Sequence, residues 1–395
     1  MSSIATSLLP AVTFLVAVLG SVFAAHGADQ FVWFGTYSGG PANSEGIYVS
    51  RFDTTTGKLT APVLAAAVKN PSFLALHPTL PVMYAVSEVA DADGKPTGAV
   101  RSLAIDEATG TLAAKNHQSS GGGGPCHVSV DRTGKVALAA NYGGGSVICF
   151  GLTADGSLEP VVADTPGGFI QHEGKGPNPQ RQEKPHGHSI YPTADGRFAV
   201  SCDLGADRVF VHALDVDKAT LASHGFGRGT PGAGPRHFAF HPGGRYGYAV
   251  NELDLTVTAF AFDPQSGTLA PIQTLSTLPA DVTDTKGFST AEIVVHSGGR
   301  FLYASNRGHD SIAMYAVDQA TGQLTFLGVE PIQGKTPRNF VIDPTGKFLL
   351  AAGQNSHTVT VFAIDAETGR LSFTGQSLDV PSPVCIRFRP TRSTP

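Results

Sequence analysis

Short apolar stretches broken by tight turns recur along the whole chain, at a period of about fifty residues. One recurring feature is a turn followed by a strand that begins with leucine, which is typical of a repeated sheet. The leucines of this feature are Leu59, Leu112, Leu158, Leu221, Leu269, Leu324 and Leu371. Long stretches with apolar residues at helical spacing do not occur, so the pattern predicts an all-β protein.

A second recurring feature is an apolar strand entered through proline or a small polar residue. It reads PSFLALHP, PCHVSVDR, PHGHSIYP, PRHFAFHP, STAEIVVH, PRNFVIDP and PSPVCIRF, starting at residues 71, 125, 185, 235, 289, 337 and 381. Both features occur seven times, and two independent counts that agree predict seven structural units. We therefore expect a seven-bladed β-propeller with four antiparallel strands in each blade.

The two ends of the repeat predict how the ring closes. The first unit lacks the proline-led strand, and the chain ends with a strand of that kind, PSPVCIRF. We expect this C-terminal strand to complete the first blade, because closure removes the free sheet edges of a large ring. No linker-like segment or run of charges interrupts the sequence from Phe31 to Phe388, which predicts a single propeller domain over residues 29–390. Residues 391–395 are expected to form a disordered tail.

An unbroken apolar run extends from Leu8 to Ala25 and precedes the first strand-like stretch, FVWFGTY. We interpret residues 1–28 as a signal peptide that is cleaved between Ala24 and Ala28. Lysine and arginine are absent before the run, so an uncleaved membrane anchor is the alternative. The expected location is periplasmic or extracellular, with membrane contact only if this segment is retained.

Composition narrows the range of partners. The formal net charge of −5 and the pI near 6.3 provide no global basic surface, so a nucleic-acid partner is not expected. Glycine-rich pieces are expected to form turns at positive φ, because the GxxxxGK[ST] pattern of a phosphate-binding loop does not occur. The four cysteines lack CxxC or metal-finger spacing and are predicted to be buried free thiols in a monomeric protein.

Folding one repeat as a hairpin brings charged residues together. In PRHFAFHPGGRYGYAVNE the turn centres on Gly244, and Arg236 and Glu252 each lie eight residues from it. An antiparallel hairpin places these two ends side by side, next to the channel if the proline-led strand is innermost. The equivalent hairpin ends in other units are Glu88, Tyr142, Arg307 and Gln354. The PHGHSIYP unit is expected to carry one extra turn residue, which brings Asp203 to the same place.

The position after each leading proline adds further groups to the same mouth of the channel. It is occupied by Ser72, Cys126, His186, Arg236, Arg338 and Ser382, with Ala291 in the unit that lacks the proline. His188 is expected to share the face of His186, because side chains on a strand repeat with period two. His237 and Glu292 are one step out of phase and could point elsewhere. The pattern predicts a pocket rich in arginine, histidine and carboxylate groups.

Several of these residues also have a purely structural interpretation. Three carboxylates could be ion-pair partners between blades or turn acceptors, namely Glu88, Asp203 and Glu252. Histidines that recur before hairpin turns indicate an architectural role, namely His77, His241 and His296. The HxH pair of His186 and His188 could hold zinc with a third ligand, but nearby arginines would repel a cation. We therefore expect neither a metal nor another cofactor.

A concave ring of arginines and histidines suits an anionic small-molecule substrate and an acyl-transfer or proton-transfer reaction. Hydrolysis of a lactone needs a base for the attacking water and hydrogen-bond donors for the oxyanion. A histidine or Glu252 could be the base, and Arg236 or Arg307 could hold the oxyanion or an anionic group of the substrate. The GxSxG motif of a serine nucleophile is absent, which favours direct attack by water.

At these residues the chain closely resembles the 6-phosphogluconolactonase/lactonase family of seven-bladed propellers, which includes the fungal carboxy-muconate lactonizing enzyme. The resemblance covers nearly the whole chain after the N-terminal segment and is carried by FGTYSGGPANSEGIYVSRFD, NPSFLALHP with YAVSE, NPQRQEKPHGHSIYPTADGRF with DLGADRVFVHALD, GPRHFAFHPGGRYGYAVNE and YASNRGHDSIAMYAVD. It implies a catalytic set of His188, Arg236, Glu252 and Arg307. Substrate-binding roles are predicted for His186, Glu88, Asp203, Asn251, Asn306 and Arg338.

The leading hypothesis is a metal-independent lactonase, a carboxylic-ester hydrolase that acts on a sugar-acid lactone. The family's best-known substrate is a phosphorylated sugar lactone of the cytosol, so an exported chain could instead act on an unphosphorylated or carboxylated lactone. A second hypothesis is a cycloisomerase that forms a lactone from a cis,cis-muconate. A third is a non-catalytic envelope propeller that binds sugar or protein, because one fold hosts many functions.

Overall fold

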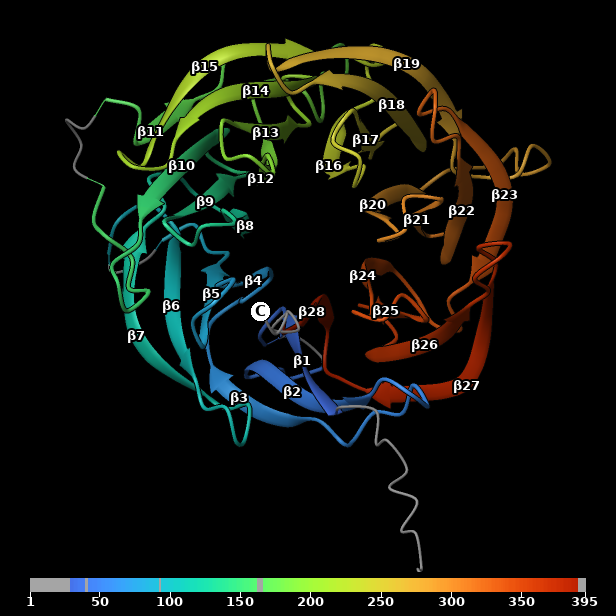
Figure 1. Cartoon of the computed structure of the whole chain (residues 1–395), viewed down its shortest axis with the longest axis horizontal. Helices are drawn as coiled ribbons and strands as arrows, with labels where there is room; N and C mark the ends of the chain where they lie inside the picture. Colours follow the sequence, from blue (N-terminus) through green and yellow to red (C-terminus); the bar gives the residue numbers. More distant parts are fainter. Residues whose placement is uncertain (1–28, 40–41, 92–93, 162–165, 390–395) are drawn as a thin grey trace, which may run out of the picture.

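The computed structural model describes residues 29–39, 42–91, 94–161 and 166–389. Its strands form seven four-stranded antiparallel sheets, which stand as blades around a central channel (Figure 1). The predicted all-β, seven-bladed propeller is confirmed. Within these ranges we find no helix that is long and apolar enough to cross a membrane. The predicted signal peptide and C-terminal tail lie outside the described residues.

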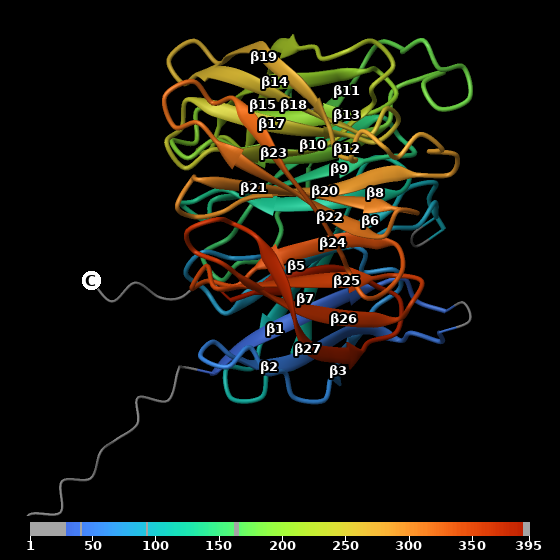
Figure 2. The same cartoon turned by 90° about the vertical axis from the view of Figure 1, so that its right-hand side faces the viewer.

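Each blade runs from an innermost strand beside the channel to an outermost strand on the wall of the ring (Figures 1 and 2). Blade 1 contains β28 (Pro383–Phe388), β1 (Asp29–Thr36), β2 (Gly46–Asp53) and β3 (Val63–Ala67). Blade 2 contains β4 (Leu74–Leu76), β5 (Val82–Ser87), β6 (Ala99–Ile105) and β7 (Leu112–Ser119). Blade 3 contains β8 (Pro125–Val130), β9 (Val136–Asn141), β10 (Ser146–Gly151) and β11 (Phe169–Gln171).

The remaining four blades continue in chain order. Blade 4 contains β12 (Gly187–Pro192), β13 (Phe198–Asp203), β14 (Arg208–Asp215) and β15 (Thr220–Gly227). Blade 5 contains β16 (Pro235–Phe240), β17 (Tyr246–Asn251), β18 (Thr256–Asp263) and β19 (Thr268–Ser276). Blade 6 contains β20 (Ser289–Val295), β21 (Phe301–Arg307), β22 (Ser311–Val317) and β23 (Leu324–Pro331), and blade 7 contains β24 (Pro337–Ile342), β25 (Phe348–Gly353), β26 (Thr358–Ile364) and β27 (Leu371–Asp379).

The ring closes through blade 1, as the sequence predicts. The last strand, β28, pairs with the first, β1, in antiparallel register, with Phe34 opposite Ile386. Both of these side chains are fully buried, so the closing strand joins the apolar core between blades 1 and 7. The innermost edge of blade 1 is therefore covered by the far end of the chain.

The recurring turn before each leucine strand has an architectural role. Its glycine takes positive φ at Gly110, Gly156, Gly322 and Gly369, which a side chain would disfavour. The carbonyl of this glycine accepts a hydrogen bond from a tyrosine hydroxyl of the preceding blade, as in Tyr84 Oη to Gly156 O at 2.8 Å and Tyr303 Oη to Gly369 O at 2.8 Å. The repeated turn therefore ties neighbouring blades together.

The histidines before the hairpin turns connect blades in the same way. His77 Nε2 lies 3.1 Å from the carbonyl oxygen of Gly134, and His296 Nε2 lies 2.9 Å from that of Gly346. His241 makes the equivalent contact. The four cysteines are buried and free, as predicted.

A β-bulge recurs at the entrance of the innermost strands and decides which side chains reach the channel. In blade 5 the register shifts between Pro235 and His237, so Arg236 has no partner on β17. The same shift falls at Cys126 in blade 3, His188 in blade 4 and Arg338 in blade 7. A bulge breaks the alternation of side chains, so two successive residues face the same side. The bulged residues of several blades consequently converge on the channel.

Candidate active site

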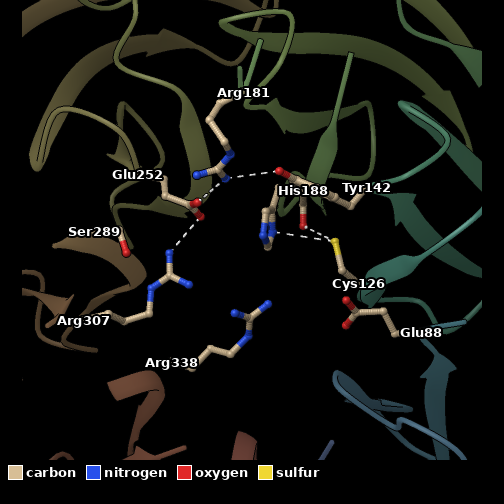
Figure 3. Close-up of a pocket in the computed structure, with 9 residues that line it drawn as sticks. All are labelled: Glu88, Cys126, Tyr142, Arg181, His188, Glu252, Ser289, Arg307 and Arg338. Carbon is tan, nitrogen blue, oxygen red and sulfur yellow. Dashed lines mark hydrogen bonds and ion pairs between the residues drawn. The ribbon is translucent and has the colours of Figure 1, made fainter. Parts of the chain in front are cut away.

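A cavity of about 370 Å³ opens at one mouth of the channel, and we call it the main cavity. Its walls come from six blades and from the segment before β12, because hairpin ends and bulged residues meet there (Figure 3). The lining residues are Glu88, Cys126, Tyr142, Arg181, His188, Glu252, Ser289, Arg307 and Arg338. The structure thus brings together five residues for which the sequence predicted catalytic or substrate-binding roles: Glu88, His188, Glu252, Arg307 and Arg338.

Glu252 binds three arginines at once. Its Oε2 lies 3.0 Å from Arg236 Nε and 3.0 Å from Arg307 Nη2, and its Oε1 lies 2.6 Å from Arg181 Nη2. Burial alone would raise the pKa of the Glu252 carboxyl group, but the nearby arginines, led by Arg307, outweigh it and hold the pKa at about 2. Glu252 is therefore ionised at neutral pH and is a weak base.

Arg236 is part of this clamp but lies deeper than the main cavity. Its side chain is 3% exposed, and its Nη1 donates to the carbonyl oxygen of Ala291 at 2.6 Å. It lines a narrow cavity of about 10 Å³ that shares four residues with the main cavity, namely Glu88, Cys126, His188 and Arg338. Arg236 thus contacts Glu252 and lines the same narrow cavity as His188, two of the other predicted catalytic residues.

Arg181 is a lining residue that the sequence reasoning missed. It comes from the segment between β11 and β12, and its guanidinium also donates to Tyr142 Oη at 3.2 Å. Its side chain is 41% exposed, so we place it at the entrance of the main cavity. Figure 3 shows its guanidinium beside Glu252 and Tyr142. The stretch NPQRQEKP, which carries part of the family resemblance, contains this arginine, but hairpin geometry could not assign it because it lies outside the repeat.

Arg338 and Glu88 are joined through a tyrosine on the opposite side of the cavity. Arg338 Nη2 donates to Tyr37 Oη at 2.8 Å, and Tyr37 Oη donates to Glu88 Oε2 at 2.9 Å. Ser72 also donates to Glu88. Burial raises the pKa of the Tyr37 hydroxyl, so it remains a donor. Figure 3 shows the Arg338 guanidinium directed at the centre of the cavity.

His188 faces the cavity as a neutral imidazole. Burial, together with the positive charges of Arg236 and Arg338 and the nearby His237, lowers the pKa of His188 well below 6.5. Its Nδ1 lies 3.7 Å from the Sγ of Cys126. A neutral imidazole can accept a hydrogen bond from water or from a substrate hydroxyl at neutral pH.

The two cavities together carry an excess of positive charge. Four arginines, Arg181, Arg236, Arg307 and Arg338, stand against two carboxylates, Glu88 and Glu252. Burial lowers the pKa of Arg307, against the opposing effect of Glu252, to about 10, so this guanidinium is still charged at neutral pH. A protein with a net charge of −5 therefore presents a local site for an anion.

His186 lies outside the main cavity, contrary to the expected shared face with His188. Its ring stacks on Tyr142 at 4.7 Å, and its nitrogens lie 3.0 Å from the Tyr142 carbonyl oxygen and 3.1 Å from Glu183 Oε1. The bulge at His188 breaks the period-two rule on which the prediction depended. In register His188, and not His186, is the equivalent of Arg236.

Asp203 is also displaced from the predicted position. The PHGHSIYP hairpin has the same length as the others, with Ser189 opposite Cys202 just as His237 is opposite Val250. The equivalent of Glu252 is therefore Leu204, and the expected extra turn residue is wrong. Asp203 is fully buried, where it accepts hydrogen bonds from the His186 backbone N–H at 2.7 Å and pairs with His172 Nδ1 at 2.7 Å.

Asn251 and Asn306 hold neighbouring strands and turns in place and do not line the main cavity. Asn251 Nδ2 donates to Thr256 and Thr258 at 2.8 and 2.9 Å, and Asn306 Nδ2 donates to the carbonyl oxygen of Thr277 at 2.9 Å. Both occupy the position one residue before the hairpin end, so their side chains alternate away from the channel. The structure therefore does not place Asn251 and Asn306 where they were predicted to contact the substrate.

The comparisons with known proteins identify the family of the chain. The model of the "Lactonase, 7-bladed beta-propeller" family matches residues 31–388. The chain belongs to this family. It is a lactonase, a carboxylic-ester hydrolase related to 6-phosphogluconolactonase, as the sequence predicted.

Named relatives cover nearly the same region. A 6-phosphogluconolactonase of Bacillus subtilis is 41% identical over 357 residues, which span 90% of this chain and 97% of the relative. A 6-phosphogluconolactonase of Formosa agariphila is 33% identical, covering 75% of this chain and 81% of the relative. The solved structure of a periplasmic gluconolactonase of Pseudomonas aeruginosa is 34% identical with a TM-score of 0.83, covering 92% of this chain and 99% of the other.

Proposed function

We propose that this lactonase hydrolyses a sugar-acid lactone that carries an anionic group, by direct attack of water on the lactone carbonyl. The observation that carries the proposal is the net positive charge of the main cavity and the adjoining narrow cavity, which four arginines and two carboxylates line together. Guanidinium groups bind phosphate and carboxylate through charge-assisted hydrogen bonds and also stabilise the oxyanion that forms on the carbonyl oxygen. The names of the relatives, 6-phosphogluconolactonase and gluconolactonase, support a sugar lactone.

The lining favours water over a covalent nucleophile. Cys126 borders the cavity, but burial, reinforced by the charge of Glu88, raises the pKa of its thiol, so the nucleophilic thiolate is disfavoured. Glu252 is engaged by its three arginines and is a weak base at a pKa of about 2. We therefore assign the base to a histidine and assign Glu252 to the orientation of the arginines.

Turnover with defined lactones tests the proposal. The mature protein is incubated with 6-phosphogluconolactone and with gluconolactone, and acid release is followed against spontaneous hydrolysis. We expect the phosphorylated lactone to have a kcat/KM at least about tenfold higher, because one extra charge-assisted contact contributes roughly 1.5 kcal/mol or more. Arg236→Ala and His188→Ala are expected to lose turnover with retained circular dichroism, whereas Arg300→Ala, at an exposed position in the turn between β20 and β21, is expected to keep it.

Each result has a clear reading. If neither lactone opens faster than in buffer, the proposed hydrolysis is wrong. If only carboxy-muconate is converted, as followed by its absorbance, the chain is a lactonizing cycloisomerase. Equal kcat/KM for the neutral and phosphorylated lactones would remove the role proposed for the arginines in binding an anionic group.

We also propose that the protein is exported and acts on its lactone outside the cytoplasm. The support is the apolar run from Leu8 to Ala25 and the similarity to a gluconolactonase named periplasmic. Mass spectrometry of the mature protein after cell fractionation tests this. We expect a new N-terminus between Ala24 and Ala28 in the exported fraction. Full-length protein confined to the cytoplasm would contradict the proposal.

A further inference from the structure

A second ring of side chains lies one residue further along each innermost strand than the bulged residues. In register this lower ring consists of Phe73, His127, Ser189, His237, Glu292, Asn339 and Cys385. In blade 5 the bulge lets both Arg236 and His237 line the narrow cavity. The channel behind the arginines therefore contains its own polar groups, although simple alternation would turn them away.

The most strongly connected of these groups is the pair formed by His237 and Glu292. His237 Nδ1 lies 2.7 Å from Glu292 Oε1, and both residues are at least nine-tenths buried. Asn339 donates to the other carboxylate oxygen, and the Ile293 backbone N–H donates to Oε1 at 3.0 Å. Burial acts to raise the pKa of Glu292, but His237, then Arg387 and the hydrogen bond from the Ile293 backbone N–H, outweigh it and lower the pKa.

This arrangement determines the tautomer of His237. An ionised carboxylate can accept hydrogen bonds but cannot donate them. The Nδ1 of His237 therefore carries the proton, and its Nε2 carries the lone pair. Nε2 is buried and has no hydrogen-bond partner among the described residues. A buried polar atom without a partner is costly, which indicates that a water or a ligand atom contacts it. The partner must be a hydrogen-bond donor, because Nε2 is the acceptor.

The narrow cavity provides space for such a partner. At about 10 Å³ it has room for roughly one water molecule, and it is lined by His237, His188, Arg236 and Arg338 among others. Glu88, Cys126, His188 and Arg338 line both this cavity and the main cavity, so the two adjoin. A water here would lie between the imidazole of His237 and a substrate in the main cavity.

Two other histidines of the channel lack this arrangement. His127 occupies the equivalent position in blade 3, but its Nδ1 accepts from the Ile190 backbone N–H at 3.3 Å, which gives the opposite tautomer. His188 has the Cys126 thiol beside its Nδ1. Among the described residues, no carboxylate is hydrogen-bonded to the His188 ring. Only His237 among these three has a carboxylate that fixes the proton on one nitrogen.

We propose that the Glu292–His237 pair is the general base of the lactonase reaction and that a water in the narrow cavity is the nucleophile. This inference rests on the hydrolysis proposed above. The water oxygen bonds to the lactone carbonyl carbon while His237 Nε2 takes one proton of the water, and the carbonyl oxygen becomes an oxyanion beside Arg236 and Arg338. The ring C–O bond then breaks, and the imidazolium returns the proton to the departing ring oxygen, which leaves as a hydroxyl group.

The pair is expected to set the acid limb of the pH profile. Below its pKa His237 is protonated on both nitrogens and cannot accept a proton from water, so kcat falls as the pH falls. Burial, against the opposing charge of Glu292, lowers the pKa of His237 below 6.5, so the acid limb lies below that pH. The titratable or charged groups that face this imidazole are Glu292, Arg236, His188, His127, Tyr191 and Arg387.

Matched asparagine substitutions test the assignment. His237→Asn keeps a donor for Glu292 but removes Nε2, and we expect kcat on 6-phosphogluconolactone to fall about 100-fold or more with KM changed less than about threefold. Glu292→Gln keeps the shape of the side chain but removes the carboxylate that fixes the proton on His237 Nδ1, and we expect a similar loss of kcat. His127→Asn is the control at the equivalent position and is expected to keep kcat within about threefold. Circular dichroism and Tm are measured for every variant.

The pH profile separates a base from a structural residue. In His237→Asn the residual kcat is expected to lose the acid limb of the unmodified protein. A residual activity that keeps this limb unchanged, or an unchanged kcat, would overturn the inference. Loss of the limb in His188→Asn instead would assign the base to His188 and leave the proposed hydrolysis intact. If His237→Asn does not fold, the kcat and pH profile of Glu292→Gln decide. An inert unmodified protein would contradict the proposed function itself.

Discussion

Replacing Glu252 by glutamine tests the electrostatic reasoning about the site. The carboxylate has a pKa of about 2 in the folded protein against an ordinary value of 4.5. At roughly 1.4 kcal/mol for each pH unit, this difference corresponds to about 3 kcal/mol of stability. Glu252 is 5% exposed, so solvent screening removes little of this. This figure already contains the loss of counter-charge at the three guanidinium groups that Glu252→Gln causes.

The sign of the pH dependence follows from the depressed pKa. The contribution of Glu252 is fully present above pH 4.5, and it is lost as the pH falls from 4.5 towards 2 and the carboxylate becomes protonated. Glutamine cannot titrate. The difference in stability between the unmodified protein and Glu252→Gln is therefore expected to be about 3 kcal/mol near pH 7 and to narrow below pH 4.5.

Thermal melts over pH 3–7 provide the measurement. With an unfolding entropy of roughly 2.1 cal/mol/K per residue over about 360 residues, 3 kcal/mol lowers Tm by about 4 °C near pH 7. Glu367→Gln is the control, because Glu367 is exposed and lies 4.0 Å from Arg300, and we expect less than about 1 °C of change. A deficit for Glu252→Gln that stays constant from pH 7 to pH 3 would refute the assignment of the low pKa to Glu252.

Three further variants test separate parts of the description. Arg181→Ala is expected to raise KM for 6-phosphogluconolactone about tenfold with little change in Tm, because the side chain is 41% exposed at the entrance, and an unchanged KM would exclude it from binding. Cys126→Ser is expected to keep at least about half of kcat, and a loss above about 100-fold would point to a covalent thioester. Removal of residues 383–395 deletes β28, so circular dichroism and gel filtration should show an unfolded or aggregated chain, and a folded monomer would contradict closure by this strand.

Much of the fold could be read from the sequence because the repeat is local. A turn residue at positive φ followed by a leucine occurs once in every blade; it is a glycine in six blades, such as Gly110 or Gly322, and Ala219 in blade 4. Seven such units each bury their apolar faces only against neighbours, so the count alone specifies a ring. The missing proline-led strand of the first unit was likewise enough to predict that β28 pairs with β1.

Hairpin symmetry also placed part of the site. Arg236 and Glu252 come together because each lies eight residues from Gly244 along one hairpin, and this spacing can be counted in the sequence. The equivalent positions of other blades, including Arg307 and Glu88, follow by the same count. Their convergence on one cavity follows from the closed ring.

The misplaced histidines have one physical origin, which is that the period-two alternation of side chains does not survive a bulge. His186 was expected beside His188, and His237 was left out of phase, because a regular strand alternates its side chains. The recurring bulge shifts the register by one residue, so the position of His188 matches that of Arg236, and His237 faces the channel as well. Neighbouring strands decide where such a bulge falls, and the sequence of one strand does not carry that information.

The sequence by itself determined the number of blades, the closing strand and the hairpin ends that bear charge, because each depends on spacing within one unit. The tertiary structure decided which of those charges meet. The pKa of Glu252 is low because Arg307, from the next blade, and Arg181, from outside the repeat, join Arg236 of the same hairpin at its two carboxylate oxygens. Contacts between residues far apart in the chain depend on the angles between blades, and no local pattern records those angles.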